Sequence, residues 1–271
     1  MKSSLRSSCV LIFTFFAASI SAQKLKMSTT SDSCLYYYYQ GWTEVMDDGN
    51  YTAAEQSYRK MISFDSEFLV GLSLLGRISL DKEERKTIEA TLQKRKSEIK
   101  GDERLLFDVF LELLTLTNLR GQDPEKAKIQ RIRAFEVGEK NLRIITHRYP
   151  DDVYTKAEYF EVLNYHHGPK GALDSLYRIS STNQLQNPFI LGFAAELEAE
   201  LGNFDNALKM AGQLRANLIN RKVPKTYVVL ADIYYKMGKK AEAKAEVDRA
   251  LILDPGNIDA QRLKIKIEEM K

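Results

Sequence analysis

The chain has 271 residues, of which 44% are hydrophobic and 28% charged, with only six prolines. These values are typical of a folded globular protein and exclude a disordered one. The formal net charge of +3 is close to neutrality and the basic runs are interleaved with acids, so the charge pattern does not call for a nucleic-acid partner.

Residues 1–22 have the order of a secretory signal peptide. Basic residues precede an apolar run over 9–20, and the small residues Ser21 and Ala22 follow it. The apolar run is shorter than a bilayer-spanning helix requires. We therefore expect cleavage after Ala22 and export to the periplasm or the exterior of a Gram-negative bacterium, with no transmembrane anchor left. An uncleaved anchor is the alternative.

Residues 23–34 are rich in Ser, Thr and Lys, which predicts a short mobile lead-in. After cleavage Cys34 would be the only cysteine, so an internal disulfide is excluded. Cys34 is then either an unpaired thiol or a crosslink to a second chain.

Residues 35–67 predict two helices joined by a turn at 49–51, Gly-Asn-Tyr. The paired acids before this turn, Asp47 and Asp48, are most simply turn and cap residues. Apolar residues recur three or four positions apart on both sides of the turn, as on one face of a helix. They are Tyr38, Trp42, Val45, Ala54, Tyr58 and Met61.

Residues 67–150 keep the helical period and predict two irregular helix pairs, the second with a long second helix. Residues 153–185 predict another pair with a His-Gly-Pro turn at 167–169, and residues 188–221 a pair with a Gly-Asn-Phe turn at 202–204.

Residues 224–257 carry the sharpest pattern, and a last amphipathic helix follows them. Gly238 ends the first helix and Pro255 the second, because proline lacks an N–H and disfavours helical backbone before it. Seven residues have the signature spacing of the tetratricopeptide repeat, which this segment resembles. They are Tyr227, Leu230, Ala231, Tyr234, Ala243, Val247 and Pro255.

The segments 35–67 and 188–221 resemble the same repeat, and 153–185 resembles it more loosely. The resemblance implies an all-α fold over 35–271: an α-α superhelix, here a right-handed tetratricopeptide solenoid of about six helix pairs plus a C-terminal capping helix. In this family the first helices line a concave face. The groove residues implied for a partner are Tyr36, Tyr39, Gln40, Thr43, Phe189, Phe193, Glu196, Val228, Asp232 and Tyr235.

This aromatic, mildly acidic lining suits a peptide partner. For the tyrosines of the first helix, packing within the helix is the alternative. Some relatives grip a carboxylate with a Lys/Asn clamp, but Tyr39 and Thr43 stand at those positions. Recognition of chaperone tails is therefore not expected.

Catalytic, cofactor and metal sites are not indicated. Residues 71–78 have the glycine spacing of a phosphate-binding loop, but Arg77 and Ile78 replace its lysine and hydroxyl residue. We therefore predict no enzyme and no cofactor, but a non-catalytic protein–protein interaction scaffold or adaptor of the cell envelope. A glycan- or nutrient-binding component of an outer-membrane uptake system is the alternative. Partner identity and oligomeric state stay open.

Overall fold

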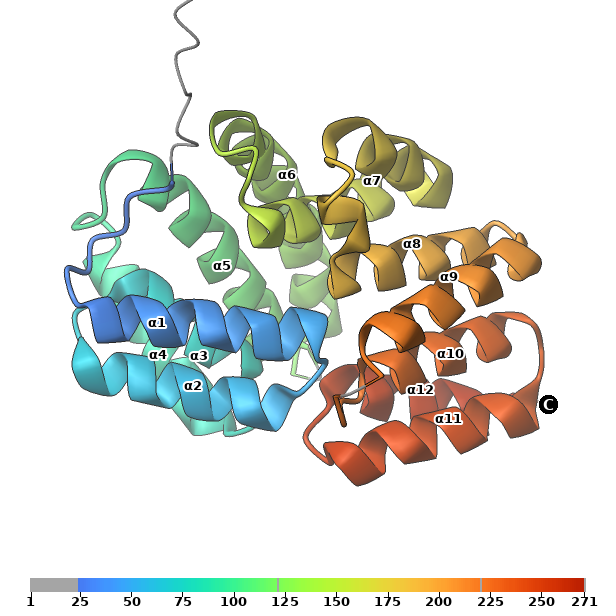
Figure 1. Ribbon diagram of the computed structural model, residues 1–271. Helices are drawn as coiled ribbons and strands as arrows, with labels where there is room; N and C mark the ends of the chain where they lie inside the picture. Colours follow the sequence, from blue (N-terminus) through green and yellow to red (C-terminus); the bar gives the residue numbers. More distant parts are fainter. Residues whose placement is uncertain (1–23, 121, 220, 271) are drawn as a thin grey trace, which may run out of the picture.

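The computed structural model describes residues 24–120, 122–219 and 221–270, which form α-helices, one π-helical turn and one 3-10 turn, without a β-strand (Figure 1). The elements are α1 (Asp32–Trp42), η1 (Thr43–Asp47), α2 (Tyr51–Phe64), α3 (Leu69–Ile78), α4 (Lys82–Arg95), α5 (Gly101–Leu119), α6 (Pro124–Arg148), α7 (Val153–Ile179), η2 (Gln184–Gln186), α8 (Pro188–Glu200), α9 (Phe204–Asn217), α10 (Lys225–Lys236), α11 (Lys240–Leu253) and α12 (Ile258–Glu268).

The helices pack in consecutive pairs: α1 with α2, α3 with α4, α5 with α6, α8 with α9, and α10 with α11. The helix α7 supplies the remaining pair by itself, because Gly168 has a φ of 68° and breaks the helix before Pro169. α12 covers α10 and α11 through three buried apolar residues, Ala260, Leu263 and Ile267. The predicted all-α fold of six helix pairs and a capping helix is confirmed.

The last pair shows why the spacing specifies this packing. Ala231 of α10 and Ala243 of α11 are fully buried, so their small side chains let the two helices approach closely. Gly238 takes a φ of 74°, which ends the first helix in a conformation that would strain a residue with a Cβ.

The middle of the array owes its close packing to two glycines of α3. A Cβ on Gly71 would lie 2.6 Å from Cε of Met61, and one on Gly76 would lie 2.9 Å from Cδ2 of Leu114. The glycine spacing that imitates a phosphate-binding loop thus lies within a helix and serves helix contacts.

The segment before α1 packs against the protein. Leu25, Met27 and Thr29 are buried, and the backbone N and Oγ of Ser28 both donate to Oε1 of Glu103 at 3.0 Å. The mobile lead-in predicted for 23–34 is therefore corrected for residues 24–34, because alternate residues of this extended segment reach the core and α1 already begins at Asp32. Gln23 and the predicted signal peptide lie outside the described residues.

Cys34 is fully buried in α1, and burial raises the pKa of its thiol. A buried, protonated thiol is a poor nucleophile, which favours the unpaired-thiol alternative over a crosslink to another chain. Among the helices of the described residues, none is both long and apolar enough to cross a bilayer.

The array bends round until its two ends meet. Figure 1 shows α1 and α2 (blue) beside α11 and α12 (red), with the other helices completing the circuit. The hydrogen bonds that join the two ends build the site described next.

Candidate functional site

Residues 43–52, here named the closing segment, run from η1 into α2 and bind the starts of later helices. Oδ1 of Asp47 accepts a hydrogen bond of 2.9 Å from the side chain of Asn187, the residue that caps α8. The carbonyl oxygen of Asp48 accepts one of 2.9 Å from the backbone N–H of Lys225, the first residue of α10.

The start of α7 contributes an aromatic contact to this junction. The rings of Trp42 and Tyr154 stack with centroids 5.8 Å apart. The Tyr154 hydroxyl lies 2.8 Å from Oγ1 of Thr43 and donates to Oδ2 of Asp47 at 3.0 Å.

Two buried polar residues between α11 and α12 also bind the closing segment. Asp254, 1% exposed, accepts from the backbone N of Tyr51 at 2.7 Å and from Oγ1 of Thr52 at 2.5 Å. Asn257, fully buried, donates from Nδ2 to the carbonyl oxygen of Gly49 at 2.5 Å. These direct bonds tie the first repeat to the last.

Two local features of the turn place these backbone groups at the junction. Gly49 has a φ of 64°, a left-handed conformation that reverses the chain after η1. Asn50 then caps α2 by accepting from the backbone N of Ala53 at 3.0 Å. The sequence therefore folds the turn locally, and the backbone groups of Gly49 and Tyr51 bind the far end of the array.

The closing segment carries two buried carboxylates, Asp47 and Asp48. Burial raises the pKa of both. For Asp48 the pKa rises to about 6, since the charge of Asp47 adds to the burial effect and the ion pair with Arg221 only partly opposes it.

We expect the variant Asp48→Asn to flatten the pH dependence of stability. The folded-state pKa of Asp48 lies above its ordinary value of 3.8, so the folded protein binds this proton more tightly. The stabilisation is present below about pH 4 and is lost as the pH rises through about 6, by on the order of 3 kcal/mol. Urea unfolding at about pH 4 and about pH 7 measures it. The exposed Asp205→Asn is the control, and an unchanged slope in Asp48→Asn would contradict the expectation.

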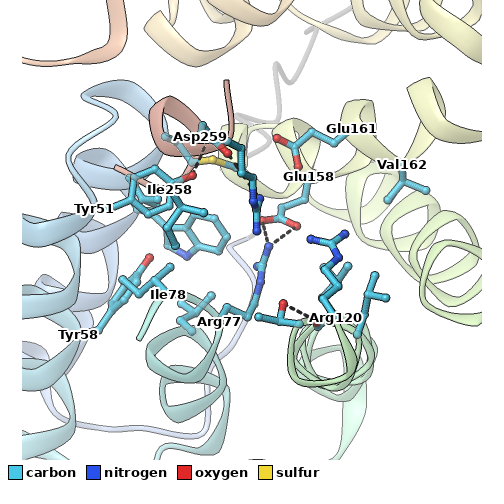
Figure 2. A pocket seen from close by; sticks show the side chains of 18 of the residues that line it. Tyr51, Tyr58, Arg77, Ile78, Arg120, Glu158, Glu161, Val162, Ile258 and Asp259 are labelled. Atoms are coloured by element: carbon cyan, nitrogen blue, oxygen red, sulfur yellow. Dashed lines mark hydrogen bonds and ion pairs between the residues drawn. The ribbon is translucent and has the colours of Figure 1, made fainter. Parts of the chain in front are cut away.

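Two pockets open on the inside of the ring. The groove pocket, about 400 Å³, lies between the closing segment, α7, α8, α10 and α12. The inner pocket, about 290 Å³, lies among α1 to α3, α5 to α7 and α12 (Figure 2). The two pockets adjoin, because both are lined by the same five residues: Val45, Tyr51, Glu161, Asp259 and Arg262.

The groove pocket combines aromatic rings with charged groups. Phe189 and Phe193 stack with centroids 5.7 Å apart, and Nζ of Lys225 lies 4.5 Å from the centroid of the Phe189 ring. Burial and the charge of Asp232 raise the pKa of Glu196 to about 7.

The structure brings half of the predicted groove residues into this pocket. Its walls include Phe189, Phe193, Glu196, Val228 and Asp232.

The other five predicted residues line neither pocket. Tyr36 is 62% exposed and Tyr39 is 39% exposed. Gln40 donates to Glu44 at 2.8 Å, while Thr43 binds Tyr154 and Tyr235 lies on α10 away from the pocket walls.

The first repeat meets the interior with different residues from those that the family pattern implies. Trp42, Val45 and Met46 line the inner pocket, with Trp42 packed against Phe110 of α5 and Tyr154 of α7. Motif spacing predicts that Trp42 packs between the helices of its own repeat. In the closed ring Trp42 also contacts α5 and α7.

The comparisons with known proteins agree with the sharpest repeat. The family model described as tetratricopeptide repeat matches residues 224–257. Residues 224–257 form a tetratricopeptide repeat. The matched segment spans α10, α11 and the turn before α12, the same segment that supplies Asp254 and Asn257.

A search of curated proteins found no match to this chain. Among solved structures, the chain is similar to the crystal structure of a thermophilic TPR protein of Thermus thermophilus. The identity is 18%, the TM-score is 0.31, and the match covers 87% of this chain and 98% of that chain. The fold described above rests on this chain's own helix contacts. Tetratricopeptide repeats serve protein–protein interaction, so the repeat at residues 224–257 is consistent with an interaction scaffold.

Proposed function

We propose that this protein is a non-catalytic scaffold or adaptor of the cell envelope that holds a peptide segment of a partner protein in the groove pocket. The observation that carries the proposal is the wall formed by Phe189 and Phe193 of α8 and Val228 of α10. Apolar side chains on successive first helices suit the anchor residues of a peptide.

The charged residues around this wall fit the same role. Nζ of Lys236 donates to Oδ2 of Asp232 at 2.6 Å and to the carbonyl oxygen of Glu196 at 3.0 Å. Such bonds hold the polar rim in place beside the half-buried side chain of Phe193. The pocket volume of about 400 Å³ admits a few side chains of a peptide, not a folded domain.

The cell-envelope part of the proposal rests on the signal-peptide pattern of residues 1–22. Cell fractionation with N-terminal sequencing tests it in the native host. An N-terminus at Gln23 in the envelope fraction supports export, and a cytoplasmic protein that keeps Met1 would overturn it.

Site-specific photocrosslinking tests the binding role. A photoreactive residue replaces Phe193 in the groove pocket, and a second variant carries it at the exposed Arg215 of α9 as control. We expect one protein to be crosslinked from position 193 in the native host and not from 215. Identical products at both positions, or none at 193, would exclude the groove as the binding site.

The variant Phe193→Ala is expected to weaken binding of the crosslinked partner by about tenfold or more, as loss of an aromatic anchor does. Tyr235→Ala is the matched control, because it removes a partly buried aromatic residue of α10 outside both pockets. Calorimetric titration measures both affinities, and thermal unfolding verifies that each variant is folded. Equal losses in the two variants would speak against an anchor at Phe193.

A further inference from the structure

The first and last repeats meet along a line of hydrogen bonds. The bonds described above join residues 48–52 to Lys225 and to residues 254–259, and this contact is here named the seam. One further bond extends it, because the hydroxyl of Tyr51 donates to Oδ2 of Asp259 at 2.6 Å. Figure 2 shows these two side chains together at the edge of the inner pocket.

Apolar packing does not accompany these bonds. Among the described residues, no buried apolar cluster crosses the seam. The buried apolar residues of α1 and α2 pack into a core that continues as far as α8. Those of α10, α11 and α12 pack with one another and with α8 and α9. Apolar contacts therefore hold the last three helices to the rest of the ring on one side only.

Cavities flank the seam where a permanent interface would be filled with side chains. The inner pocket and the groove pocket both have walls from the closing segment and from α12. An unfilled space forfeits the dispersion contacts that packed side chains make. The polar groups of the seam, in turn, can exchange their protein partners for water at small net cost. Parting the seam is therefore cheaper than parting helices that share an apolar core.

We propose that the seam is a gate to the groove pocket. α10, α11 and α12 move as one unit away from the closing segment and turn on their apolar contact with α8 and α9, while each helix stays folded. Opening separates two walls of the groove pocket, since Tyr51 lies on one side of the seam and Val228 and Asn257 lie on the other. A partner segment then enters from the side and is enclosed when the bonds re-form. This role in partner entry rests on the function proposed above, whereas the opening itself does not.

A disulfide across the seam provides the test. A Cβ on Gly256 would lie 3.8 Å from the Cβ of Thr52, which is a typical separation in disulfides. Gly256 does not have a positive φ, so its backbone accepts a side chain. The double variant Thr52→Cys, Gly256→Cys should thus lock the closed ring when oxidised. Peptide mapping of the full chain verifies the bond between positions 52 and 256, and thermal unfolding of the reduced form verifies that the variant is folded.

Hydrogen exchange then compares the oxidised and reduced forms without any partner. The backbone N–H of Lys225 donates across the seam, away from the lock, and we expect it to exchange about tenfold more slowly in the oxidised form. The backbone N–H of Ala127 is the control, because it donates to Asp123 within the start of α6, and its exchange should not change. Equal changes at the two positions, no change at Lys225, or a disulfide that does not form would overturn the gate.

Photocrosslinking tests the role of the gate in partner entry. The double variant, with the photoreactive residue at position 193, is mixed in its oxidised or reduced form with dialysed extract of the native host. We expect oxidation to remove most of the crosslinked product, whereas the single variant Thr52→Cys should give the same yield after either treatment. Equal yields from the two forms of the double variant would overturn entry through the seam. Absence of any product from both forms would contradict the proposed binding function instead, and the exchange of Lys225 would still decide whether the seam opens.

Discussion

Replacing Arg77 by methionine is expected to lower the free energy of unfolding by about 3–5 kcal/mol. The side chain of Glu158 is only 4% exposed and loses its cationic partner, Arg77, in this variant. A buried carboxylate without a counter-charge is among the costliest defects that one substitution can create. The guanidinium of Arg77 also lies 4.9 Å from the ring centroid of Phe110, so its contact with that aromatic face is lost as well.

Denaturant unfolding of two further variants separates the causes. The double variant Arg77→Met, Glu158→Gln removes both charges and should recover most of the lost stability. Arg148→Met breaks the more exposed ion pair with Asp102 and should cost about 1 kcal/mol or less. If Arg77→Met cost no more than Arg148→Met, the pair with Glu158 would not be a structural requirement of the ring.

The helix pairs were predictable from sequence because each is encoded in a short stretch of chain. The apolar period of α10 and α11, the glycine between them and Pro255 after them act over a few turns of helix. The same holds for the break in α7, where Gly168 and Pro169 interrupt the helix whatever surrounds them.

Closure of the ring was not predictable in the same way. The bond between Asn257 and Gly49 joins residues 208 positions apart, and a local pattern carries no information on such pairings. Asp47 and Asp48 are turn residues, as the sequence indicates, but they also bind the starts of α8 and α10. One short polar residue can shape its own turn and bond another repeat, and sequence reveals only the first role.

The residues of the candidate site were likewise predictable only where they follow a local repeat pattern. Phe189 and Val228 lie in repeats that follow the family pattern, and both line the groove pocket. The first repeat packs instead against the far end of the array, which turns Tyr36 and Tyr39 toward solvent. Arg77 and Arg120 were not recognised as pocket residues, because a lone arginine on an amphipathic helix is usually a solvated one.

Asn257→Ala is expected to lower the free energy of unfolding by about 2–4 kcal/mol, more than the loss of a helix cap explains. Asn257 caps α12 by accepting from the backbone N of Ala260 at 2.7 Å, and its amide also donates to Gly49. The variant therefore loses a cap and leaves a buried carbonyl oxygen unpaired. Asn50→Ala is the matched control, since the Asn50 side chain caps α2 through a bond within its own repeat, and should cost about 1 kcal/mol.

Hydrogen exchange distinguishes a weaker helix from an opened ring. In Asn257→Ala we expect faster exchange at the backbone N–H groups of Tyr51 and Lys225, which donate across the junction, as well as at the start of α12. In Asn50→Ala the faster exchange should stay within the first turn of α2. If Asn257→Ala affected only α12, its bond to Gly49 would contribute nothing to closure, and the first and last repeats would be held together by other bonds, such as those of Tyr51 with Asp254 and Asp259.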